Sequence, residues 1–187
     1  MNNSTQAIKD VLANAQELYS LEQVDTAITV MAGQITAKLQ DHNPLLLCVM
    51  VGGLYLAGRL QAELRFPLEI DYVHATRYRG LSQGGMLQWL AKPSLPLAGR
   101  HVLIVDDILD GGVTLAEIVA YCQAQDTASV VTAVLADKQI ARHSTGLAKA
   151  DFSALTVPDR FVFGAGMDYQ NYLRNAPGIF AVRESDA

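Results

Sequence analysis

The sequence has few of the features that mark membrane proteins or disulfide-rich proteins. Its two cysteines, Cys48 and Cys122, lie in apolar runs without the C-x-x-C or histidine spacing of metal and redox sites, so we expect two buried free thiols. No run approaches the roughly 18 apolar residues of a membrane span, and the N-terminus lacks the basic start and apolar core of a signal peptide. These absences predict a cytoplasmic chain with no membrane partner.

Positive charge is also scarce. The chain has 14 Lys and Arg against 19 Asp and Glu, a net charge of -5 at pH 7. This balance offers no basic face to a phosphate backbone and argues against nucleic acid as a partner. Apolar residues, in contrast, make up half of the 187 positions, as in folded domains rather than disordered chains. The length suits one domain, which we expect to span residues 1–187.

Predicted helices and strands alternate along the chain. Apolar residues three or four apart predict helices at about 8–19, 21–39, 54–64 and 114–123. Near-continuous apolar runs predict strands at 45–51, 68–74, 101–105 and 129–136. Strands of this kind predict an α/β fold with a central, mostly parallel sheet flanked by helices on both faces. We expect a core at about 42–157 and a small hood formed by about 158–187 with the N-terminal helices.

Two segments interrupt this pattern. Between Ala75 and Pro96 the periodicity fades over a stretch longer than compact domains leave unstructured without a function, which predicts a mobile functional loop. The C-terminal part is expected to add smaller elements, including an extended stretch at Phe161–Phe163 and a short helix near Asp168–Leu173.

The chemistry is concentrated in the stretch HVLIVDDILDGGVTL. An apolar strand leads into Asp106 and Asp107, Asp110 follows, and Gly111-Gly112 open the next helix. Open parallel sheets bind ligands at the carboxyl ends of their strands, and two glycines before a helix N-terminus can form a backbone nest for a phosphate. Adjacent carboxylates repel one another and are costly to bury, so we expect sugar hydroxyls or a divalent cation to satisfy them.

Three other interpretations fit parts of the sequence. The spacing Asp-Asp-x-x-Asp also occurs on helices of isoprenoid enzymes that bind diphosphate through magnesium, but the β-run before it and the glycines after it break such a helix. Gly53-x-x-x-x-Gly58-Arg59 imitates a P-loop, which requires Lys followed by Ser or Thr where this chain has Arg59 and Leu60. The third is a purely structural acidic turn, although three acids around a glycine pair exceed what a turn requires.

The stretch VLIVDDILDGGVTL resembles the signature of the type I phosphoribosyltransferases, which bind phosphoribosyl pyrophosphate. The later FVFGAGMDYQNYLRN is similar to the pattern F-V-V-G-x-x-L-D-Y-x-x-x-x-R of their 6-oxopurine branch, the hypoxanthine-guanine phosphoribosyltransferases. The resemblance covers about residues 45–182. It implies the type I phosphoribosyltransferase fold, a homodimer or homotetramer, and purine salvage. The implied reaction transfers the 5-phosphoribosyl group to N9 of hypoxanthine or guanine, giving IMP or GMP and pyrophosphate.

The resemblance also implies roles for single residues around the ribose and the base. Asp106 and Asp107 would bind the ribose 2′- and 3′-hydroxyls. The 5′-phosphate would be cradled by Asp110, Gly111, Gly112, Val113 and Thr114. Asp110 would also act as general base near purine N7. The base itself would meet Lys138 at O6, the stacked ring of Phe161 and the main chain of Val162.

Other implied roles concern pyrophosphate and its metal. Asp168 would ligate Mg²⁺, together with the pair Asp106 and Asp107. Arg174 and Arg142 would face pyrophosphate, because the guanidinium fork matches phosphate oxygens. The pyrophosphate loop would include Val51 and Gly52, with a non-proline cis peptide expected at Met50-Val51, and Tyr78 would belong to the loop that closes over the reaction.

The chain departs from the family pattern at four positions. Asp106 stands where Glu is common, Gly111 where Thr or Ser is common, Arg77 replaces a loop serine, and Val51 replaces a lysine found in some members. Two alternatives to the implied enzyme stay open. One is a non-enzymatic regulator on the same fold that binds a nucleotide or RNA. The other is a phosphoribosyltransferase that prefers xanthine or a pyrimidine.

Overall fold

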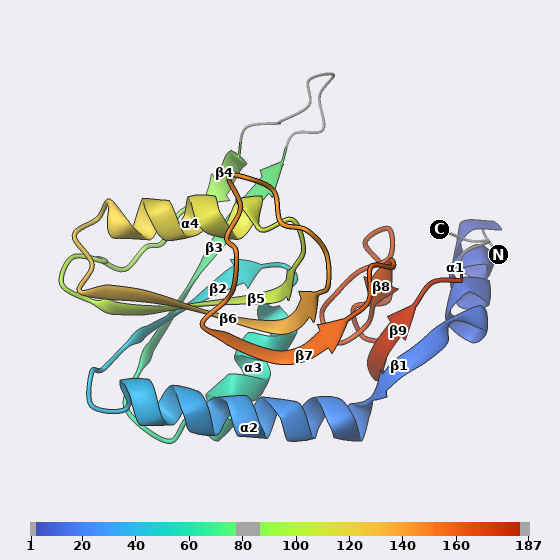
Figure 1. Cartoon of the computed structure of the whole chain (residues 1–187), viewed down its shortest axis with the longest axis horizontal. Coiled ribbons are helices and arrows are strands. Elements are labelled where there is room, and N and C mark those ends of the chain that lie inside the picture. Colours follow the sequence, from blue (N-terminus) through green and yellow to red (C-terminus); the bar gives the residue numbers. More distant parts are fainter. Residues whose placement is uncertain (1–2, 78–86, 184–187) are drawn as a thin grey trace.

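The computed structural model describes residues 3–77 and 87–183, and most of these residues form one large sheet with helices on both of its faces (Figure 1). The strands of this sheet are β2 (Leu45–Met50), β3 (Glu69–Arg77), β4 (Leu87–Ala91), β5 (His101–Leu109), β6 (Ser129–Lys138) and β7 (Phe152–Val157). They lie in the order β4-β3-β2-β5-β6-β7, and every neighbouring pair is parallel except β3 with β4. The predicted α/β fold with a mostly parallel sheet is confirmed.

The central strands β2, β5 and β6 are buried on both faces. Leu45, Leu47, Ile104, Val105 and Ala133 expose none of their surface. Each fully buried Leu, Ile or Val side chain contributes about 1.5–3 kcal/mol to folding through burial of apolar surface. Because helices cover both sides of these strands, no residue needs to face water. This arrangement explains why these strands are continuous apolar runs in the sequence and do not alternate between apolar and polar residues.

The helices divide between the two faces of the sheet. α2 (Leu21–Leu39) and α3 (Leu54–Glu63) cover one face, and α4 (Val113–Gln123) covers the other (Figure 1). α2 begins with a capping box in which Ser20 accepts from the amide of Gln23 while the Gln23 side chain accepts from the amide of Ser20. The expected grouping placed α2 with the hood. Its apolar face packs into a core that contains residues of the large sheet and also Val162, Ile179 and Ala181 from the C-terminal part, so this grouping stays a prediction.

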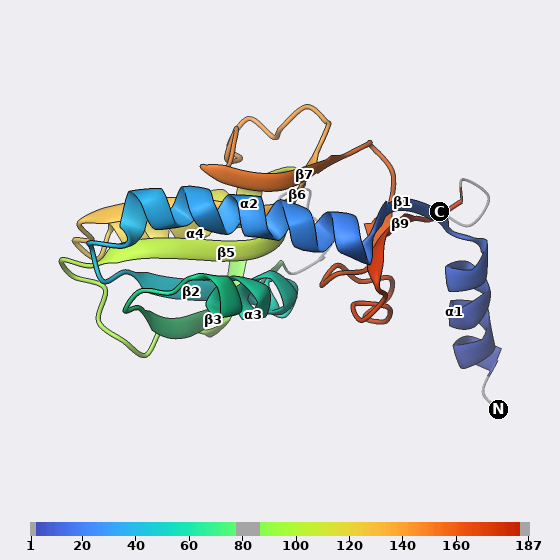
Figure 2. The ribbon, with the colours of Figure 1, turned by 90° about the horizontal axis from the view of Figure 1, so that it is seen from below.

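A second sheet of three strands lies at one end of the molecule and joins the two ends of the chain. β1 (Gln16–Ser20) pairs antiparallel with β9 (Gly178–Ala181), which also pairs antiparallel with β8 (Val162–Phe163). α1 (Asn3–Asn14) stands beside this end sheet, away from the large sheet (Figure 2). The prediction of a helix as far as residue 19 is wrong, because pairing with β9 makes residues 16–20 a strand. Pairing partners far along the chain override local propensity.

Several boundaries also differ from those predicted. β5 continues four residues beyond Val105, because its ladder with β6 extends to the pair Leu109 and Asp137. The stretch at 168–173 is not helical: Gln170, Asn171 and Leu173 have positive φ, which an α-helix does not allow. The strands β4, inside the predicted loop at 75–96, and β7 were not predicted.

Cys48 and Cys122 are free and buried, as predicted, and burial raises the pKa of each thiol to about 11.

Across the described ranges, no helix combines the length and the apolar character that a bilayer crossing would need.

Asp71 is a carboxylate buried in the core at β3. It accepts hydrogen bonds from the amides of Tyr72 (2.7 Å), Ser94 (2.6 Å) and Leu95 (2.8 Å) and from the Ser94 hydroxyl (3.0 Å). Burial raises the pKa of Asp71, but these four donors outweigh burial and the pKa is lowered from its usual value. The carboxylate therefore stabilises the segment that leads from β4 to β5.

We expect Asp71→Asn to lower the free energy of unfolding by about 1–3 kcal/mol, because buried donors lose a charged acceptor. A lowered folded-state pKa contributes stability above the unfolded pKa of about 3.9, and this contribution is lost as the pH falls through the folded pKa. The difference between variant and wild type in urea titrations should thus be large at pH 7 and shrink below pH about 4. The exposed Asp41→Asn is the control, and an equal loss in both variants would contradict this role.

Candidate active site

A cavity of about 670 Å³ opens at the carboxyl ends of β2, β3 and β5, where open parallel sheets bind their ligands. It receives residues from the large sheet, from the loop that follows β5 and from the loop 164–177 of the end sheet. Its lining consists of Val49, Met50, Val51, Gly52, His74, Ala75, Thr76, Asp106, Asp107, Ile108, Leu109, Asp110, Gly111, Gly112, Val113, Thr114, Leu115, Asp168, Asn171 and Arg174. The residues expected to bind ribose, 5′-phosphate and pyrophosphate thus largely meet in one place.

Asp106 and Asp107 lie inside β5, not after it, and both line the cavity. The amide of Asp107 donates to Asp106 Oδ1 at 2.9 Å. Burial raises the pKa of Asp106 well above its usual value, and the adjacent charge of Asp107 raises it further. Burial also raises the pKa of Asp107, against the opposing effects of Asp106 and the Arg174 charge. A pair of acids held in this way is best satisfied by hydroxyl donors or by a cation.

Arg174 ties the 164–177 loop to this acidic pair. Its Nη1 lies 3.5 Å from Asp107 Oδ2 and donates to the carbonyl of Gly166 at 2.6 Å. Its Nη2 donates to Asp168 Oδ1 at 2.6 Å, and the amide of Asn171 donates to Asp168 Oδ2 at 2.7 Å. One guanidinium therefore sets the position of a second carboxylate across the cavity from β5.

The backbone at Gly52 comes close to both of these segments. The peptide bond between Met50 and Val51 is cis, which confirms the prediction. A Cβ placed on Gly52 would lie 2.0 Å from Asp107 Oδ2, and a Cβ on Gly166 would lie 2.6 Å from the carbonyl oxygen of Gly52. Only glycine fits at these two contacts, where three distant segments of the chain meet.

A glycine turn follows β5 and starts α4. Gly112 is the N-cap of α4 and adopts a left-handed conformation with φ +79°, which favours glycine. The turn and the N-terminus of α4 line the cavity. Free amides of a helix N-terminus and its dipole favour an anion at this position.

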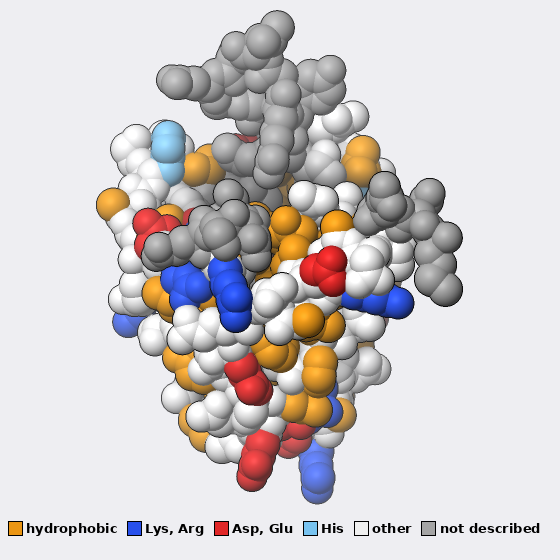
Figure 3. Space-filling view, turned by 90° about the vertical axis from the view of Figure 1, so that its right-hand side faces the viewer, with side chains coloured by type: hydrophobic (Ala, Val, Ile, Leu, Met, Phe, Trp, Pro, Cys, Tyr) orange, Lys and Arg blue, Asp and Glu red, His pale blue; other side chains and the backbone are white. Residues whose placement is uncertain are grey.

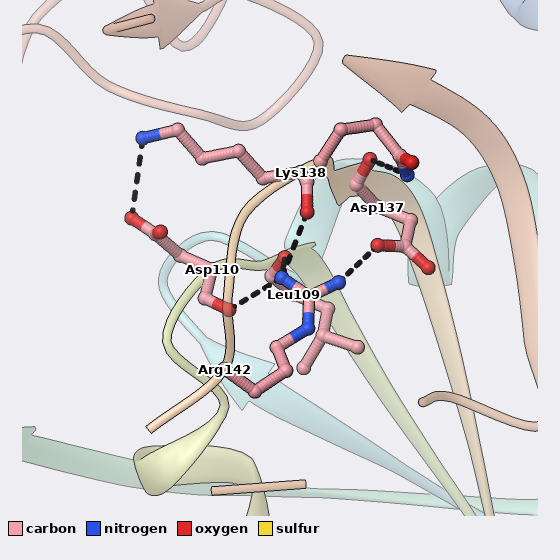
Figure 4. Close-up of polar contacts among 6 residues, drawn as sticks. Leu109, Asp110, Asp137, Lys138 and Arg142 are labelled. Atoms are coloured by element: carbon pink, nitrogen blue, oxygen red, sulfur yellow. Dashed lines mark hydrogen bonds and ion pairs between the residues drawn. The ribbon is translucent and has the colours of Figure 1, made fainter. Parts of the chain in front are cut away.

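Lys138 lies beside the cavity at the end of β6. Because Leu109 pairs with Asp137, the next residues of the two strands, Asp110 and Lys138, become neighbours. The Lys138 ammonium is 3.6 Å from Asp110 Oδ2 (Figure 4). It also lies 3.6 Å from Asp159 Oδ1, and its side chain is 14% exposed. Lys138 does not itself line the cavity, but it contacts a carboxylate that does.

The two other residues expected at the base lie on the end sheet. Phe161 is 48% exposed, and its ring meets that of Tyr169 edge to face at a centroid distance of 5.6 Å. Val162 is buried and pairs with Ala181 in the ladder of β8 and β9. Neither residue lines the cavity, and their roles toward a purine stay predictions.

Arg142 does not line the cavity either. Its Nη1 donates to the main-chain carbonyls of Leu109 (3.1 Å), Asp110 (2.7 Å) and Lys138 (2.8 Å), and its Nη2 pairs with the Asp137 carboxylate (Figure 4). These contacts hold the guanidinium outside the cavity. The position of Arg142 therefore does not support the expected contact with pyrophosphate. Tyr78, expected on the closing loop, lies outside the described residues.

Some residues of the site were not predicted from the sequence. His74 and Thr76 line the cavity from β3, and Asn171 lines it from the 164–177 loop. His74 could have been found, since it is the last residue of a predicted strand whose carboxyl end faces the site. Asn171 and Asp159 carry no such signal, because their positions depend on how the end sheet folds.

The described ranges contain no group of three or more His, Cys, Asp or Glu side chains placed to hold a metal ion. Asp106, Asp107 and Asp168 therefore do not form a complete protein cage. Mg²⁺ usually keeps several waters and binds through one or two carboxylates plus substrate phosphates. The residues present fit a magnesium ion that a phosphorylated substrate shares with the protein.

The surface agrees with the acidic balance of the sequence. On the face seen in Figure 3, acidic and basic side chains are interspersed with apolar ones, and the described residues form no continuous basic surface there. A face of this kind lacks the clustered Lys and Arg that bind nucleic acid backbones.

The chain matches the family described as the phosphoribosyl transferase domain over residues 14–170. A hypoxanthine-guanine-xanthine phosphoribosyltransferase from Tritrichomonas foetus is 32% identical over 168 residues, which cover 90% of this chain and 91% of that protein. A hypoxanthine-guanine phosphoribosyltransferase from Bacillus subtilis is 31% identical over 163 residues, 87% of this chain and 89% of that protein. The crystal structure of a hypoxanthine phosphoribosyltransferase from Staphylococcus aureus superposes with a TM-score of 0.85 at 25% identity, covering 91% of this chain and 92% of that one.

The close contact at Gly52 generates a prediction. Gly52→Ala should weaken binding of phosphoribosyl pyrophosphate, the ligand implied by the family resemblance, about tenfold or more, because the new methyl group displaces the Asp107 carboxylate. Isothermal titration calorimetry measures this loss. Gly58→Ala is the matched control, since a Cβ at Gly58 meets nothing within 4 Å. Equal affinities of both variants would contradict the crowding at Gly52.

Proposed function

The chain belongs to the phosphoribosyl transferase domain family, and on this premise we propose that it transfers the 5-phosphoribosyl group from phosphoribosyl pyrophosphate to N9 of hypoxanthine or guanine. The products are IMP or GMP and pyrophosphate, and the activity belongs to purine salvage. The observation that carries the proposal is one cavity that combines an acidic pair, a glycine turn at a helix N-terminus and, at its edge, the ion pair of Asp110 with Lys138.

The sugar phosphate would occupy the β5 side of the cavity. Asp106 and Asp107 accept hydrogen bonds from the ribose hydroxyls, which offsets the cost of burying two adjacent carboxylates. The amides from Gly111 to Thr114 bind the 5′-phosphate together with the positive end of α4. Fixing both ends of the sugar holds C1′ in one position, which lowers the entropic part of the barrier.

Pyrophosphate would leave toward the cis-peptide loop and Arg174. Val51 and Gly52 line this side of the cavity, and the Arg174 guanidinium carries the positive charge there. Magnesium, when bound, would neutralise charge on the leaving group. Asp168, with the pair Asp106 and Asp107 beside it, would hold the ion jointly with substrate oxygens.

The base would enter between Asp110, Lys138 and Phe161. The bond from C1′ to pyrophosphate oxygen breaks as the bond from C1′ to N9 forms, and Asp110 accepts a proton that the purine loses. Lys138 donates to the oxygen at position 6, and Phe161 stacks on the ring while Val162 meets its edge. Adenine carries an amino donor at position 6, so a site built around this lysine rejects it.

The oligomeric state and the cellular location of the protein are part of the proposal. The family resemblance supports a homodimer or homotetramer, and the composition supports a cytoplasmic location for a chain expected to form one domain. Gel filtration with light scattering would measure the oligomeric state.

A steady-state assay with phosphoribosyl pyrophosphate, magnesium and one base at a time tests the function. We expect turnover with hypoxanthine and guanine and at least about 100-fold less with adenine, because a buried donor facing a donor is left unsatisfied. The name of the Tritrichomonas foetus relative includes xanthine, so xanthine competes as a second candidate base. A preference for xanthine would select that alternative. Binding of nucleotide without turnover of any base would select the regulator.

Variants of Asp110 and Lys138 distinguish the role of the general base from that of the donor to the purine. Asp110→Asn should lower kcat by about 100-fold or more with a smaller change in the KM for phosphoribosyl pyrophosphate, because the general base is lost. Lys138→Ala should chiefly impair the use of 6-oxopurines, seen as a fall in kcat/KM for hypoxanthine. Lys38→Ala, which removes an exposed lysine from α2, is the control. Equal losses of sugar-phosphate binding in Asp110→Asn and Lys138→Ala would contradict the assignment.

A further inference from the structure

Four consecutive carbonyls at the end of β5 all receive hydrogen bonds from one short segment of the chain. The Arg142 side chain donates to the carbonyls of Leu109 and Asp110, at 3.1 and 2.7 Å. The amide of His143 donates to the carbonyl of Gly111 at 3.1 Å, and the amide of Leu147 donates to that of Gly112 at 3.0 Å. We call residues 142–147 the backing segment and residues 109–112 the glycine loop.

The backing segment lies against the side of the glycine loop that faces away from the cavity. Residues 109–112 line the cavity, whereas none of residues 142–147 does. A Cβ on Gly146 would lie 2.2 Å from the carbonyl oxygen of Gly111, and a Cβ on Gly112 would lie 2.5 Å from that of Leu147. The two backbones are thus in direct contact, and all four carbonyls accept hydrogen bonds from the backing segment. The Gly112 carbonyl also accepts from the amide of Ala116 in α4, at 3.0 Å.

Arg142 also connects the glycine loop to Lys138. The same Nη1 that reaches Leu109 and Asp110 donates to the carbonyl of Lys138 at 2.8 Å (Figure 4). The Asp137 carboxylate pairs with Nη2, so the guanidinium charge is balanced although both side chains are only 15% exposed. Nη1 carries two N–H groups for these three carbonyls, so one N–H is shared between two of them. Together with Nη2, the planar guanidinium links the ends of two strands and a carboxylate in a fixed geometry.

We propose that the backing segment orients the glycine loop for anion binding, and that Arg142 is the positioning residue that aligns this loop with Lys138. The proposal rests on the function proposed above. In a peptide unit the carbonyl and the amide point in opposite directions. Holding four successive carbonyls on the far side leaves the following amides directed toward the cavity, where they bind phosphate. A carbonyl that turned toward the cavity would repel the same anion.

The experiment measures binding of ribose 5-phosphate by isothermal titration calorimetry to the wild type, Arg142→Gln and Arg142→Lys. Arg100→Gln is the matched control. Arg100 is 20% exposed, donates to the carbonyl of Asn43 at 3.2 Å and pairs with Glu69 at 2.5 Å, but it lies at the opposite end of β5. All proteins are compared at a temperature at which circular dichroism shows them folded.

We expect Arg142→Gln to raise the Kd of ribose 5-phosphate about tenfold or more, Arg142→Lys to raise it less, and Arg100→Gln to leave it within about twofold. In turnover assays, the KM for phosphoribosyl pyrophosphate should rise more than kcat falls in the Arg142 variants. If Arg142→Gln does not fold, Arg142→Lys decides by the same comparison with Arg100→Gln. Unchanged binding in the Arg142 variants, or an equal loss in Arg100→Gln, would overturn the proposal. Absence of binding by the wild type would instead overturn the proposed phosphate site.

Discussion

The pairing of β5 with β6 is the constraint on which the rest of the site depends. The ladder runs in parallel from the pair His101 and Ser129 to the pair Leu109 and Asp137. Both strands are buried by helices on either side, so their apolar residues set the register. This register places Asp110 and Lys138 side by side where the ladder ends, with 3.6 Å between Asp110 Oδ2 and Lys138 Nζ. A shift of one residue would separate these charges and turn each side chain to the other face of the sheet.

Two kinds of carboxylate in this molecule show how burial can serve stability or ligand binding. Asp71 receives four hydrogen bonds, its pKa is lowered, and its negative charge is satisfied by the protein itself. Asp106 and Asp107 lie next to each other, and burial raises the pKa of both. The protein gives the first carboxylate four donors, whereas the acidic pair receives the Asp107 amide at 2.9 Å and the Arg174 guanidinium at 3.5 Å. Raised pKa values of this kind are typical of functional sites.

Close contacts at glycines give the cavity its shape. Gly52 lies against the Asp107 carboxylate, Gly166 against the backbone of Gly52, and Gly146 against the backbone of Gly111. A side chain at the first contact would displace the carboxylate, and at the other two it would force two backbones apart, so the cavity walls depend on glycine as much as on the charged residues. Arg174 and Arg142 then connect these segments to the end of β5 through Asp107 and the carbonyl of Asp110.

The alternation of buried strands and amphipathic helices can be read from the sequence alone, because each leaves its own pattern of apolar residues along the chain. The acidic and glycine-rich stretch at the end of β5 can be read in the same way, since local composition and spacing carry that signal. Which distant residues join this stretch depends on the tertiary structure. Residues 16–20 became a strand because they pair with β9, and residues 168–173 became an irregular loop because Arg174 and Asp168 bind there. Arg142 turned toward carbonyls instead of the cavity for the same reason: partners that are far apart in sequence have no periodic pattern from which their contact could be inferred.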